Sequence, residues 1–512
     1  MDYVFLGGAG EVGGSCMLLS VSDRHYLFDC GIRVNRTGAE SLPDLKLLKE
    51  RVPTLDGIFV SHAHADHIGA LPLAHAAFPK APIYATEPTR HLGAVMLNNA
   101  VSLMESETDG SLFTQEAVEA TLGKMRVFSV GSWHQLAEGI RVLFIRSGHI
   151  LGAVCIYLET PDGTFFYSGD VSSFHQKTID GLDTSLLRVS PDFMVCEGTY
   201  GDSVHPSRSV EEMNLAKSVA EVISDGGSVL IPSFALGRAQ EIILILKQAM
   251  LNKVIPKFPV VTDGLVNSIC SVYASMPEAL GGKIQNYMKH AQQPLFFSEY
   301  IRAARMGEQE VILKEGVPKC IIASSGMLMG GASVTYAKGL CGDPKNAIFL
   351  SGYQDAESPG RRLQELESGD RLVFPDGVPS EVKCRVARFH LSAHSDQGQL
   401  VSFIKQVNPK SVALVHGEID TLSQLRDKLM KAFPVLCPQN GQMLSATDNP
   451  VWLPPSTRER INRKIAVDFD VQITGNKMNL DISNLDADRW NDFCMGDHVA
   501  TLKGEKLIIR KK

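Results

Sequence analysis

A dense group of potential metal ligands lies in a single short stretch of the chain. Three histidines and an aspartate occur within six positions, directly after an apolar run at residues 58–60 that predicts a buried strand. They are His62, His64, Asp66 and His67. In a turn after a strand such side chains can converge, whereas on a helix they would spread around the axis. Imidazole and carboxylate groups are common zinc ligands, so this spacing indicates a metal site rather than a polar loop.

More candidate ligands follow other predicted strands. Each of these strands is an apolar run that ends at a ligand-type side chain close to a small residue. The side chains are Asp29, His149, Asp170 and His416. The carboxyl ends of strands are where α/β folds build their sites, so we expect these residues to join the 62–67 group. One histidine at a strand end is more often structural; four such residues beside the dense group indicate a shared site.

Composition and charge narrow the class of protein. The 512 residues are 44% hydrophobic and 21% charged, which predicts a globular chain of two or three domains. The formal charge of −7 argues against a protein that coats nucleic acid, but it allows a nuclease with a locally positive cleft. The ten cysteines form no Cys-x-x-Cys pair, which favours reduced thiols and a cytoplasmic location. The sequence pattern predicts neither a signal peptide nor an apolar run long enough to span a membrane, so no membrane partner is expected.

A glycine motif near the start of the chain could mislead. Gly8, Gly10 and Gly13 match Gly-x-Gly-x-x-Gly, the pattern of a dinucleotide-binding turn. That turn requires a helix after the third glycine, but residues 15–19 and 25–28 predict a hairpin of two strands. A dinucleotide site is therefore not expected.

Between residues 228 and 351 strands and helices alternate, which predicts a parallel α/β sheet inserted into the first domain. A capping box, Ser209 to Glu212, is expected to open the helix before it. The strand ends carry small polar groups suited to anions, although each alone could equally be an ordinary turn or cap. Together with nearby arginines they predict a channel for a phosphodiester backbone. The predicted contacts are Ser233, Arg238, Ser324, Ser325, Gly326, Ser351, Gly352, Tyr353, Gln354 and Arg361.

These motifs, in this order, resemble the metallo-β-lactamase superfamily and within it the β-CASP nucleases, which include the RNA-cleaving subunit of the mRNA 3′-end machinery. The matching positions are Asp29, 62–67, His149, Asp170, Glu197, His394 and His416. The resemblance implies an α/β fold: an αββα sandwich with an inserted β-CASP domain. The implied boundaries are 1–200 and 379–455 for the sandwich, 201–378 for the insertion, and 456–512 for a small β-rich appendage. That appendage could serve RNA binding, self-association or packing.

The resemblance also implies roles for the residues. One metal would be held by His62, His64 and His149, a second by Asp66, His67 and His416, and Asp170 would bridge them. Two Zn²⁺ ions are expected, with Mn²⁺ or another divalent ion as an alternative. The expected catalytic residues are His394, Glu197, Asp29 and Asp66. His394 would be the general acid, Glu197 would orient its ring, and Asp29 would act behind the ligands.

The expected function is a zinc-dependent ribonuclease acting on single-stranded RNA, endonucleolytic with a 5′-to-3′ exonucleolytic mode. Two alternatives are a DNA nuclease of the same superfamily and a catalytically silent RNA-binding scaffold. The resemblance favours RNA, because the DNA enzymes of the family carry an apolar residue at the position of His416. It disfavours the scaffold, because silent members have lost metal ligands and this chain has lost none. Ser358-Pro359 departs from the family pattern, which leaves that loop's substrate preference open. RNA is the expected partner; a homodimer and protein partners stay open.

Overall fold

The computed structural model describes residues 1–105, 111–290, 293–355 and 357–445, and the backbone of four strands between residues 470 and 511. Residues 1–450 form one compact unit and residues 451–512 form a second. The described strands of the second unit pair as two antiparallel hairpins, β23 (Asp470–Thr474) with β24 (Lys477–Asp481) and β25 (His498–Lys503) with β26 (Lys506–Lys511). The expected appendage therefore contains strands, while residues 456–469 lie outside the described residues.

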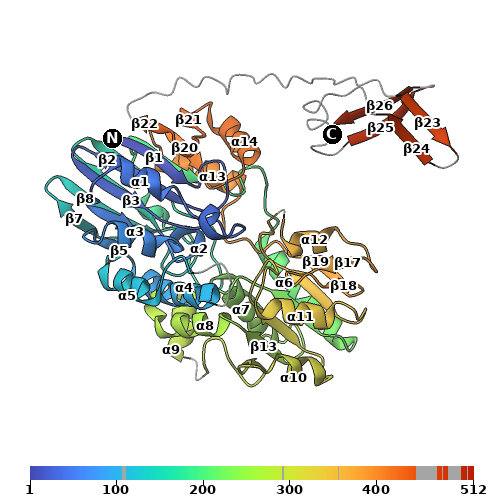
Figure 1. Ribbon diagram of the computed structural model, residues 1–512. Coiled ribbons are helices and arrows are strands. Elements are labelled where there is room, and N and C mark those ends of the chain that lie inside the picture. The colour runs from blue at the N-terminus through green and yellow to red at the C-terminus, as the bar shows by residue number, and fades with distance from the viewer. Residues whose placement is uncertain are drawn as a thin grey trace. The chain divides into compact units, whose positions relative to one another are not determined.

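Two seven-stranded mixed sheets form the larger part of the first unit (Figure 1). The first sheet, in spatial order, contains β22 (Met443–Ser445), β1 (Asp2–Gly7), β2 (Cys16–Val21), β3 (Arg24–Phe28), β4 (Gly57–Phe59), β5 (Ile83–Ala85) and β6 (Met125–Val127). The second contains β21 (Val435–Leu436), β20 (Val412–Val415), β11 (Phe193–Glu197), β10 (Gly163–Tyr167), β9 (Val154–Thr160), β8 (Ile140–Arg146) and β7 (Trp133–Ala137). The chain thus forms the second sheet before it closes the first with β22.

The two sheets pack face to face over a core of buried aromatic and aliphatic side chains. Alternation along each strand points one set of side chains into this core. Phe28 of the first sheet lies edge-on to Phe165 of the second, with ring centroids 5.1 Å apart. Tyr3 stacks on Phe193 at 4.4 Å. This core fixes the two sheets relative to each other, and with them the strand ends on either side.

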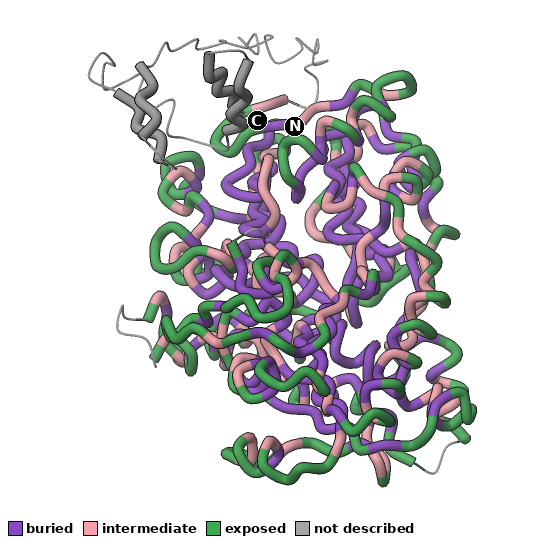
Figure 2. The backbone as a smooth tube through the Cα atoms, turned by 90° about the vertical axis from the view of Figure 1, so that its right-hand side faces the viewer, coloured by how far each residue is buried: buried purple, intermediate pink, exposed green. Residues whose placement is uncertain are grey.

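Helices cover the outer faces of the two sheets, so each sheet is buried on both sides. Figure 2 shows buried residues in the interior of the first unit and exposed residues around its outside. The helices over the first sheet are α1 (Leu45–Arg51), α2 (Ala65–Ile68), α3 (Leu71–Ala77), α4 (Glu87–Glu105) and α5 (Gln115–Lys124). Those over the second are α13 (Gln397–Val407) and α14 (Ile419–Leu429). Three short 3-10 turns are η1 (Gly38–Ser41), η2 (Thr184–Leu186) and η3 (Pro277–Ala279). The expected αββα sandwich is confirmed.

A third, fully parallel sheet of six strands forms the inserted α/β part. Its strands, in spatial order, are β14 (Ile301–Ala303), β13 (Val260–Asp263), β15 (Cys320–Ala323), β12 (Val229–Pro232), β16 (Ala347–Leu350) and β19 (Arg385–Arg388). Its helices are α6 (Arg208–Ser224), α7 (Arg238–Leu251), α8 (Val266–Ser275), α9 (Gly282–His290), α10 (Gln309–Lys314), α11 (Ala332–Leu340) and α12 (Pro359–Glu365). A two-stranded ribbon, β17 (Arg371–Val373) with β18 (Pro379–Glu381), precedes β19. The alternation therefore predicts this sheet correctly, and the sheet continues through β19, beyond the expected boundary at 378.

Helix α7 is buried around most of its circumference. It packs against α6 and α8 of the third sheet's helices, and it belongs to the same core cluster as the helices that cover the first sheet. A helix that is apolar on all sides belongs inside a protein, which explains its run of isoleucine and leucine. Glu241 is one of several buried polar residues of this helix, with 1% of its surface exposed. Its carboxylate accepts hydrogen bonds from the N–H groups of Lys177 and Thr178, both at 2.7 Å, and so ties the loop after β10 to this helix.

The structure can be compared with three local features of the sequence: the glycine motif, the capping box and Ser358. After Gly13 the chain enters the β2–β3 hairpin, so no dinucleotide-type helix follows the glycine motif. The capping box expected at Ser209 is wrong: α6 begins at Arg208, and its N-cap Ser207 makes no side-chain cap. Glu212 pairs instead with Arg208 and Lys177, because two cations offer it stronger partners than a backbone N–H. Ser358, the departure from the family pattern, caps the start of α12.

The nine cysteines in the described part of the chain are all free, and all but one are buried. None of the helices in that part combines the length and the apolar character that a membrane span requires.

Candidate metal centre and active site

The side chains of the site come from strand ends that the two sheets bring to one edge. In the first sheet β3 and β4 run parallel, with Phe28 paired to Phe59, so Asp29 and the 62–67 loop follow neighbouring strands. In the second sheet β10, β11 and β20 run parallel and adjacent. Asp170 follows the first of them, Glu197 ends the second, and His416 follows the third. Parallel pairing therefore places residues far apart in sequence at one edge.

The first ligand group joins three imidazole nitrogens and one carboxylate oxygen, from His62, His64, His149 and Asp170. Nε2 of His62 and Nε2 of His149 lie 3.2 and 3.1 Å from Nδ1 of His64. Oδ2 of Asp170 lies 3.5 Å from each of the two Nε2 atoms. Four nitrogen and oxygen donors at this spacing match a tetrahedral zinc set.

The second ligand group joins Asp66, His67 and His416. Nε2 of His416 lies 3.2 Å from Oδ2 of Asp66. Nε2 of His67 lies 3.9 Å from the same oxygen and 3.4 Å from Oδ1 of Asp170. Asp170 thus turns one carboxylate oxygen to each group. All seven expected ligands lie together, divided between the groups as the resemblance implies.

Two buried atoms in this centre show that the residues fit a cation. Nε2 of His67 and Oδ1 of Asp170 have no hydrogen-bond partner in the part of the chain that the structure describes, although both atoms are inaccessible to solvent. Leaving a buried polar atom unpaired costs on the order of 1–3 kcal/mol. A cation between the ligand groups would satisfy both atoms, because an imidazole nitrogen and a carboxylate oxygen each offer a lone pair to it.

Each imidazole is oriented through its second ring nitrogen. The five rings donate as follows: His62 to Ser61 Oγ at 3.0 Å, His64 to Leu236 O at 3.2 Å, His67 to Asp29 Oδ2 at 2.7 Å, His149 to Ala393 O at 3.0 Å, and His416 to Thr199 Oγ1 at 3.0 Å. When a ring is neutral, its proton therefore lies on the nitrogen bonded to this partner, and the other nitrogen, which faces the centre, is free to bind a cation. Leu236 follows β12 and Ala393 follows β19, both strands of the inserted sheet, so the insertion helps to orient the ligands.

Asp29 is the most heavily bonded of the supporting residues. Besides His67, its carboxylate accepts the O–H of Tyr167 at 2.9 Å and both the N–H and O–H of Ser61 at 2.7 Å. It is completely buried. Four donors stabilise its negative charge in a site without solvent, so Asp29 can hold the ring of His67 firmly. This is the supporting position expected for it.

Backbone conformation helps to set the direction in which these side chains point. Asp29 and His416 have φ values of +55° and +50°, which residues other than glycine rarely adopt. Such conformations persist at functional sites where the surrounding structure enforces them. Close packing is also required at Gly31, where an added Cβ would lie 1.7 Å from the carbonyl oxygen of Asp66.

His394 and Glu197 form a pair beside the first ligand group. Nδ1 of His394 lies 3.0 Å from both carboxylate oxygens of Glu197, and its Nε2 lies 3.9 Å from Oδ2 of Asp170. Burial disfavours the charged ring, but the carboxylates of Glu197 and Asp170 outweigh it and raise the pKa of His394 to about 9. The ring can therefore keep a proton on Nε2, the atom turned toward the centre, at neutral pH. This geometry suits a general acid.

In the first ligand group the pKa values of the histidines are lowered, in contrast to that of His394. Burial lowers the pKa values of His62, His64 and His149, and the neighbouring imidazoles lower those of His62 and His149 further. Neutral imidazole is the form that binds a metal. The electrostatics of the site therefore separate three ligand histidines, which are neutral, from His394, which is protonated.

A cavity of about 210 Å³ opens onto these groups, between the sandwich and the inserted sheet. Arg238 is among the predicted phosphate contacts that line it, and it is 7% exposed. Its Nη1 is buried without a hydrogen-bond partner. Burial and the neighbouring Arg208 lower the pKa of Arg238 to about 9, so the guanidinium stays charged at neutral pH. An unpaired, charged donor at a cavity wall suits a phosphate oxygen.

The other predicted phosphate contacts divide into two sets. Gly352 and Tyr353 line the cavity beside Arg238. The rest do not line it: Ser233, Ser324, Ser325, Gly326, Ser351, Gln354 and Arg361. Several bond within their own turns; the hydroxyl of Ser233 donates to Ile231 O at 3.1 Å, for example. Arg361 is exposed and pairs with Glu365 at 3.0 Å, one helical turn away.

Among the cavity residues that carry no prediction from the sequence are Thr199, Tyr200 and Phe234. Thr199 accepts from His416 and donates to Glu197 at 2.5 Å. Tyr200 and Phe234 supply aromatic faces. Gly326 and Gly352 pack against Phe234, where an added Cβ would lie within 3.1 Å of its ring. Thr199 and Tyr200 lie two and three residues after Glu197 in the chain, and this proximity is the signal that points toward them.

The αββα sandwich, its seven-ligand centre and the inserted parallel sheet define a metallohydrolase of the metallo-β-lactamase type. Family models agree: the metallo-beta-lactamase superfamily matches residues 9–233, the Beta-Casp domain 239–363, and the Zn-dependent metallo-hydrolase RNA specificity domain 380–438. The chain belongs to this superfamily, in its β-CASP group, and is a metal-dependent hydrolase of the nuclease class.

Several archaeal relatives are similar over most of the chain. An RNase J-like protein of Methanocaldococcus jannaschii is 33% identical over 81% of this chain and 92% of its own length. The transcription termination factor FttA of Methanothermobacter thermautotrophicus is 31% identical over 81% of this chain and 66% of its own. The chain thus spans about two thirds of that relative. An Enterococcus faecalis protein of unknown function shares the fold, with a TM-score of 0.52 at 14% identity, covering 86% of this chain and 99% of that one.

Proposed function

We propose that the chain is a zinc-dependent ribonuclease that hydrolyses phosphodiester bonds of single-stranded RNA, with one cation in each ligand group. One observation carries the proposal: Asp170 turns Oδ2 to the first group and Oδ1 to the second, beside a protonated His394. Divalent cations held there would polarise phosphoryl oxygens and lower the pKa of a water molecule.

The chain's own residues supply the other parts of the reaction. Arg238 binds a phosphate oxygen through its unpaired Nη1 and positions the backbone at the cavity. His394 gives the proton on Nε2 to the sugar oxygen that leaves phosphorus, and Glu197 keeps the ring oriented and charged. Asp29 holds His67 in place from behind the ligands.

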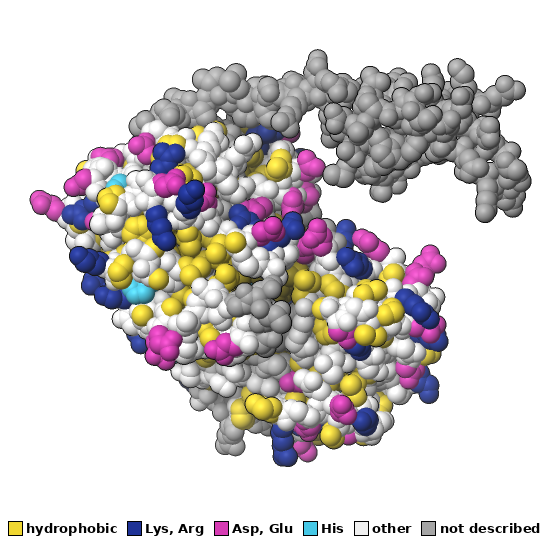
Figure 3. Space-filling model, viewed as in Figure 1, with side chains coloured by type: hydrophobic (Ala, Val, Ile, Leu, Met, Phe, Trp, Pro, Cys, Tyr) yellow, Lys and Arg dark blue, Asp and Glu magenta, His cyan; other side chains and the backbone are white. Residues whose placement is uncertain are grey.

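RNA is proposed as the substrate on two grounds. The printed names of relatives include an RNase J-like protein and a probable RNase, both of Methanocaldococcus jannaschii, the latter matched over 100% of its length. The cavity also has aromatic faces from Phe234 and Tyr353, against which the bases of a single strand can stack. Figure 3 shows hydrophobic side chains on both sides of the boundary between the sandwich and the inserted part, on the face drawn.

The proposed mode is endonucleolytic, with 5′-to-3′ exonucleolysis as a second mode. Comparing 5′-labelled with 3′-labelled RNA separates the two, because endonucleolysis gives labelled fragments of intermediate length with either label, whereas 5′-to-3′ exonucleolysis releases the 5′ label as a mononucleotide. The name of the FttA relatives refers to transcription termination, but this chain covers 66% of the first of them, so the proposal is limited to cleavage.

The test is cleavage of labelled single-stranded RNA by purified protein, with zinc content measured on the same sample. We expect about two zinc ions per chain, and loss of cleavage in a chelator with recovery on adding zinc. His394→Ala should lose most activity and keep its metal. His390→Ala is the matched control, since His390 is exposed and does not line the cavity. Equal cleavage by metal-free and metal-loaded protein would refute the zinc proposal, and preference for competing single-stranded DNA would refute RNA.

A further inference from the structure

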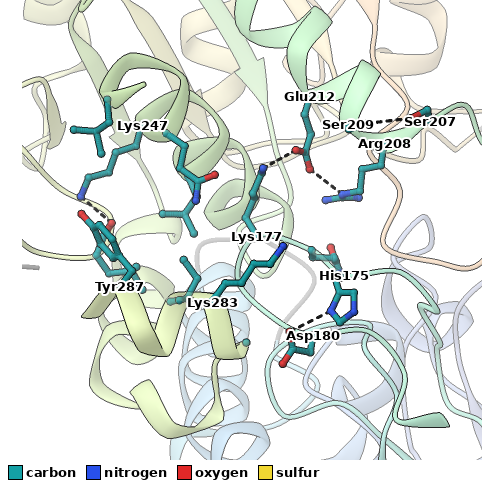
Figure 4. Close-up of a pocket in the computed structure, with 17 residues that line it drawn as sticks. His175, Lys177, Asp180, Ser207, Arg208, Ser209, Glu212, Lys247, Lys283 and Tyr287 are labelled. Atoms are coloured by element: carbon teal, nitrogen blue, oxygen red, sulfur yellow. Dashed lines mark hydrogen bonds and ion pairs between the residues drawn. The ribbon is translucent and has the colours of Figure 1, made fainter. Parts of the chain in front are cut away.

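A cavity of about 560 Å³ lies apart from the metal centre. It is bounded by the loop after β10, by the start of α6, by the second half of α7 and by the start of α9 (Figure 4). It shares no lining residue with the cavity at the metal centre. Its size falls in the range of small-molecule sites, roughly 300–1,000 Å³. Nothing in the proposed cleavage reaction uses it.

Positive charge exceeds negative charge along its walls. Four cationic side chains and two carboxylates line it, namely Lys177, Arg208, Lys247 and Lys283 with Asp180 and Glu212. Both carboxylates are already occupied. Glu212 binds Lys177 at 2.8 Å and Arg208 at 3.1 Å, while Asp180 accepts from His175 at 3.2 Å and from the N–H of Gly282 at 3.0 Å.

Two of the cations have no carboxylate partner among the described residues. The ammonium group of Lys247 donates to the carbonyls of Pro294, Leu295 and Phe297, at 2.6, 2.9 and 3.3 Å. Carbonyl oxygens hold this group in place but do not cancel its charge. Lys283 makes no hydrogen bond or ion pair with the described residues, and its side chain extends into the cavity between Lys177 and Asp180 in Figure 4. An anion is therefore the ligand that these walls lack.

The opposite side of the cavity is apolar and aromatic. Tyr287 of α9 lies 6.0 Å from the Lys247 ammonium, measured to its ring centroid. Leu244 and Leu251 of α7 and Ile284 of α9 complete this side. A planar, weakly polar ring can pack there while charged groups reach the lysines. The combination of an apolar side and an excess of cations matches a nucleotide better than it matches inorganic phosphate.

The cavity walls also hold the loops of the metal centre. Gln176 donates through Nε2 to the carbonyls of Gly148 and His149, at 2.9 and 2.8 Å. Arg208 donates through Nη1 to Ser392 O at 2.8 Å, two residues before His394. A ligand that moved either wall residue would move a ligand histidine or the general acid.

We propose that this cavity binds a free nucleoside di- or triphosphate, with its phosphates at Lys177 and Lys283 and its base against Tyr287, and that its occupancy alters the metal centre through Gln176 and Arg208. The altered activity rests on the proposed function; binding does not. The same phosphate chemistry could come from the backbone of RNA, which the experiment must distinguish.

The binding test is calorimetry of the full chain with ADP and with adenosine. ADP should bind, and adenosine should bind at least tenfold more weakly because it lacks the phosphates. Lys283→Glu should weaken ADP binding at least tenfold. The matched control is Lys289→Glu, an exposed lysine of the same helix that does not line the cavity, which should bind ADP as the unaltered chain does. No ADP binding, or equal binding by Lys283→Glu, would overturn the proposal.

A second measurement separates free nucleotide from RNA. ADP binding is measured with and without saturating single-stranded RNA, in a chelator that keeps the RNA intact. Unchanged ADP affinity supports a separate nucleotide site, whereas competition would assign the cavity to RNA phosphates and overturn the proposal. In cleavage assays ADP should change kcat of the unaltered chain and not that of Lys283→Glu. A protein that binds ADP but cuts no RNA would refute the proposed function alone.

Discussion

Thr199 and His416 are joined by a hydrogen bond that links the metal centre to His394, the proposed general acid. Nδ1 of His416 donates to Oγ1 of Thr199 at 3.0 Å, and that hydroxyl donates to Oε2 of Glu197 at 2.5 Å. Glu197 in turn accepts from Nδ1 of His394. One carboxylate thus orients His394 directly and His416 through Thr199.

The first prediction concerns this link. Thr199→Val keeps the shape of the side chain but removes the hydroxyl, so His416 loses its acceptor and Glu197 loses a donor. Loss of such a supporting bond costs on the order of 10–100-fold in activity or metal affinity. We expect kcat to fall by about tenfold or more and zinc to dissociate more readily in a chelator titration. Thr199→Ser should restore both; failure of Ser to do so would mean that the methyl group matters and the hydroxyl does not.

The second prediction concerns Asp170. Asp170→Asn keeps the volume of the side chain and removes the charge that both ligand groups share. Zinc content should fall below one ion per chain, and cleavage should become undetectable. The free energy of unfolding in excess chelator should change little compared with the unaltered chain in chelator. Full zinc content in this variant would contradict the shared position of Asp170.

The third prediction concerns pH. The pKa of His394 is raised to about 9, so the protonated ring is present below that pH and is lost as pH rises through it. Cleavage should therefore decline on the alkaline side near that value. Glu197→Gln removes the adjacent negative charge that raises this pKa, so the decline should move to lower pH. The measurement is kcat against pH for both proteins.

The control for the pH experiment is Glu211→Gln, since Glu211 accepts from the N–H of His390, outside the cavity. Its profile should match that of the unaltered chain. Identical alkaline limbs in all three proteins would exclude His394 as the titrating acid.

The fourth prediction concerns two arginines that the sequence predicts equally as phosphate contacts. Arg238→Met should lower kcat/KM for RNA by about 10- to 100-fold, because the cavity loses its unpaired charged donor. Arg361→Met should change kcat/KM less than about twofold, because Arg361 is exposed and pairs with Glu365. Equal losses in the two variants would indicate that RNA contacts the surface of α12 as well.

The fifth prediction concerns packing at the metal loop. Gly31→Ala would place its Cβ against the carbonyl of Asp66, a backbone group that cannot rotate away. Overpacking of this kind costs about 1–3 kcal/mol or more of unfolding free energy and should weaken zinc binding. Gly123→Ala, in α5 with no atom near the added Cβ, should instead stabilise by about 0.5–1 kcal/mol. Urea denaturation of both variants measures the difference.

Much of the fold follows from local pattern. The alternating strands and helices after Glu197 predict the inserted parallel sheet, and the apolar runs before Asp29, His149, Asp170 and His416 predict the strands that end at them. Local hydrophobic periodicity is enough for this, because a strand or helix buries the face that its own sequence makes apolar. The position at which a helix begins follows less directly from local sequence. Ser209 and Glu212 are residue types that form a capping box, but Glu212 forms ion pairs with Lys177 and Arg208 instead.

The sequence by itself determined which side chains could bind cations, and that they follow strands. Only the tertiary structure decided that Asp66 meets His416 across 350 positions, which ring nitrogen of each histidine faces the centre, and that Arg238 has a free donor at the cavity while Arg361 does not. These relationships depend on partners such as Leu236 and Thr199 that lie far along the chain from the rings they orient. Sheet pairing and packing bring such partners together, and no local pattern records contacts between distant segments.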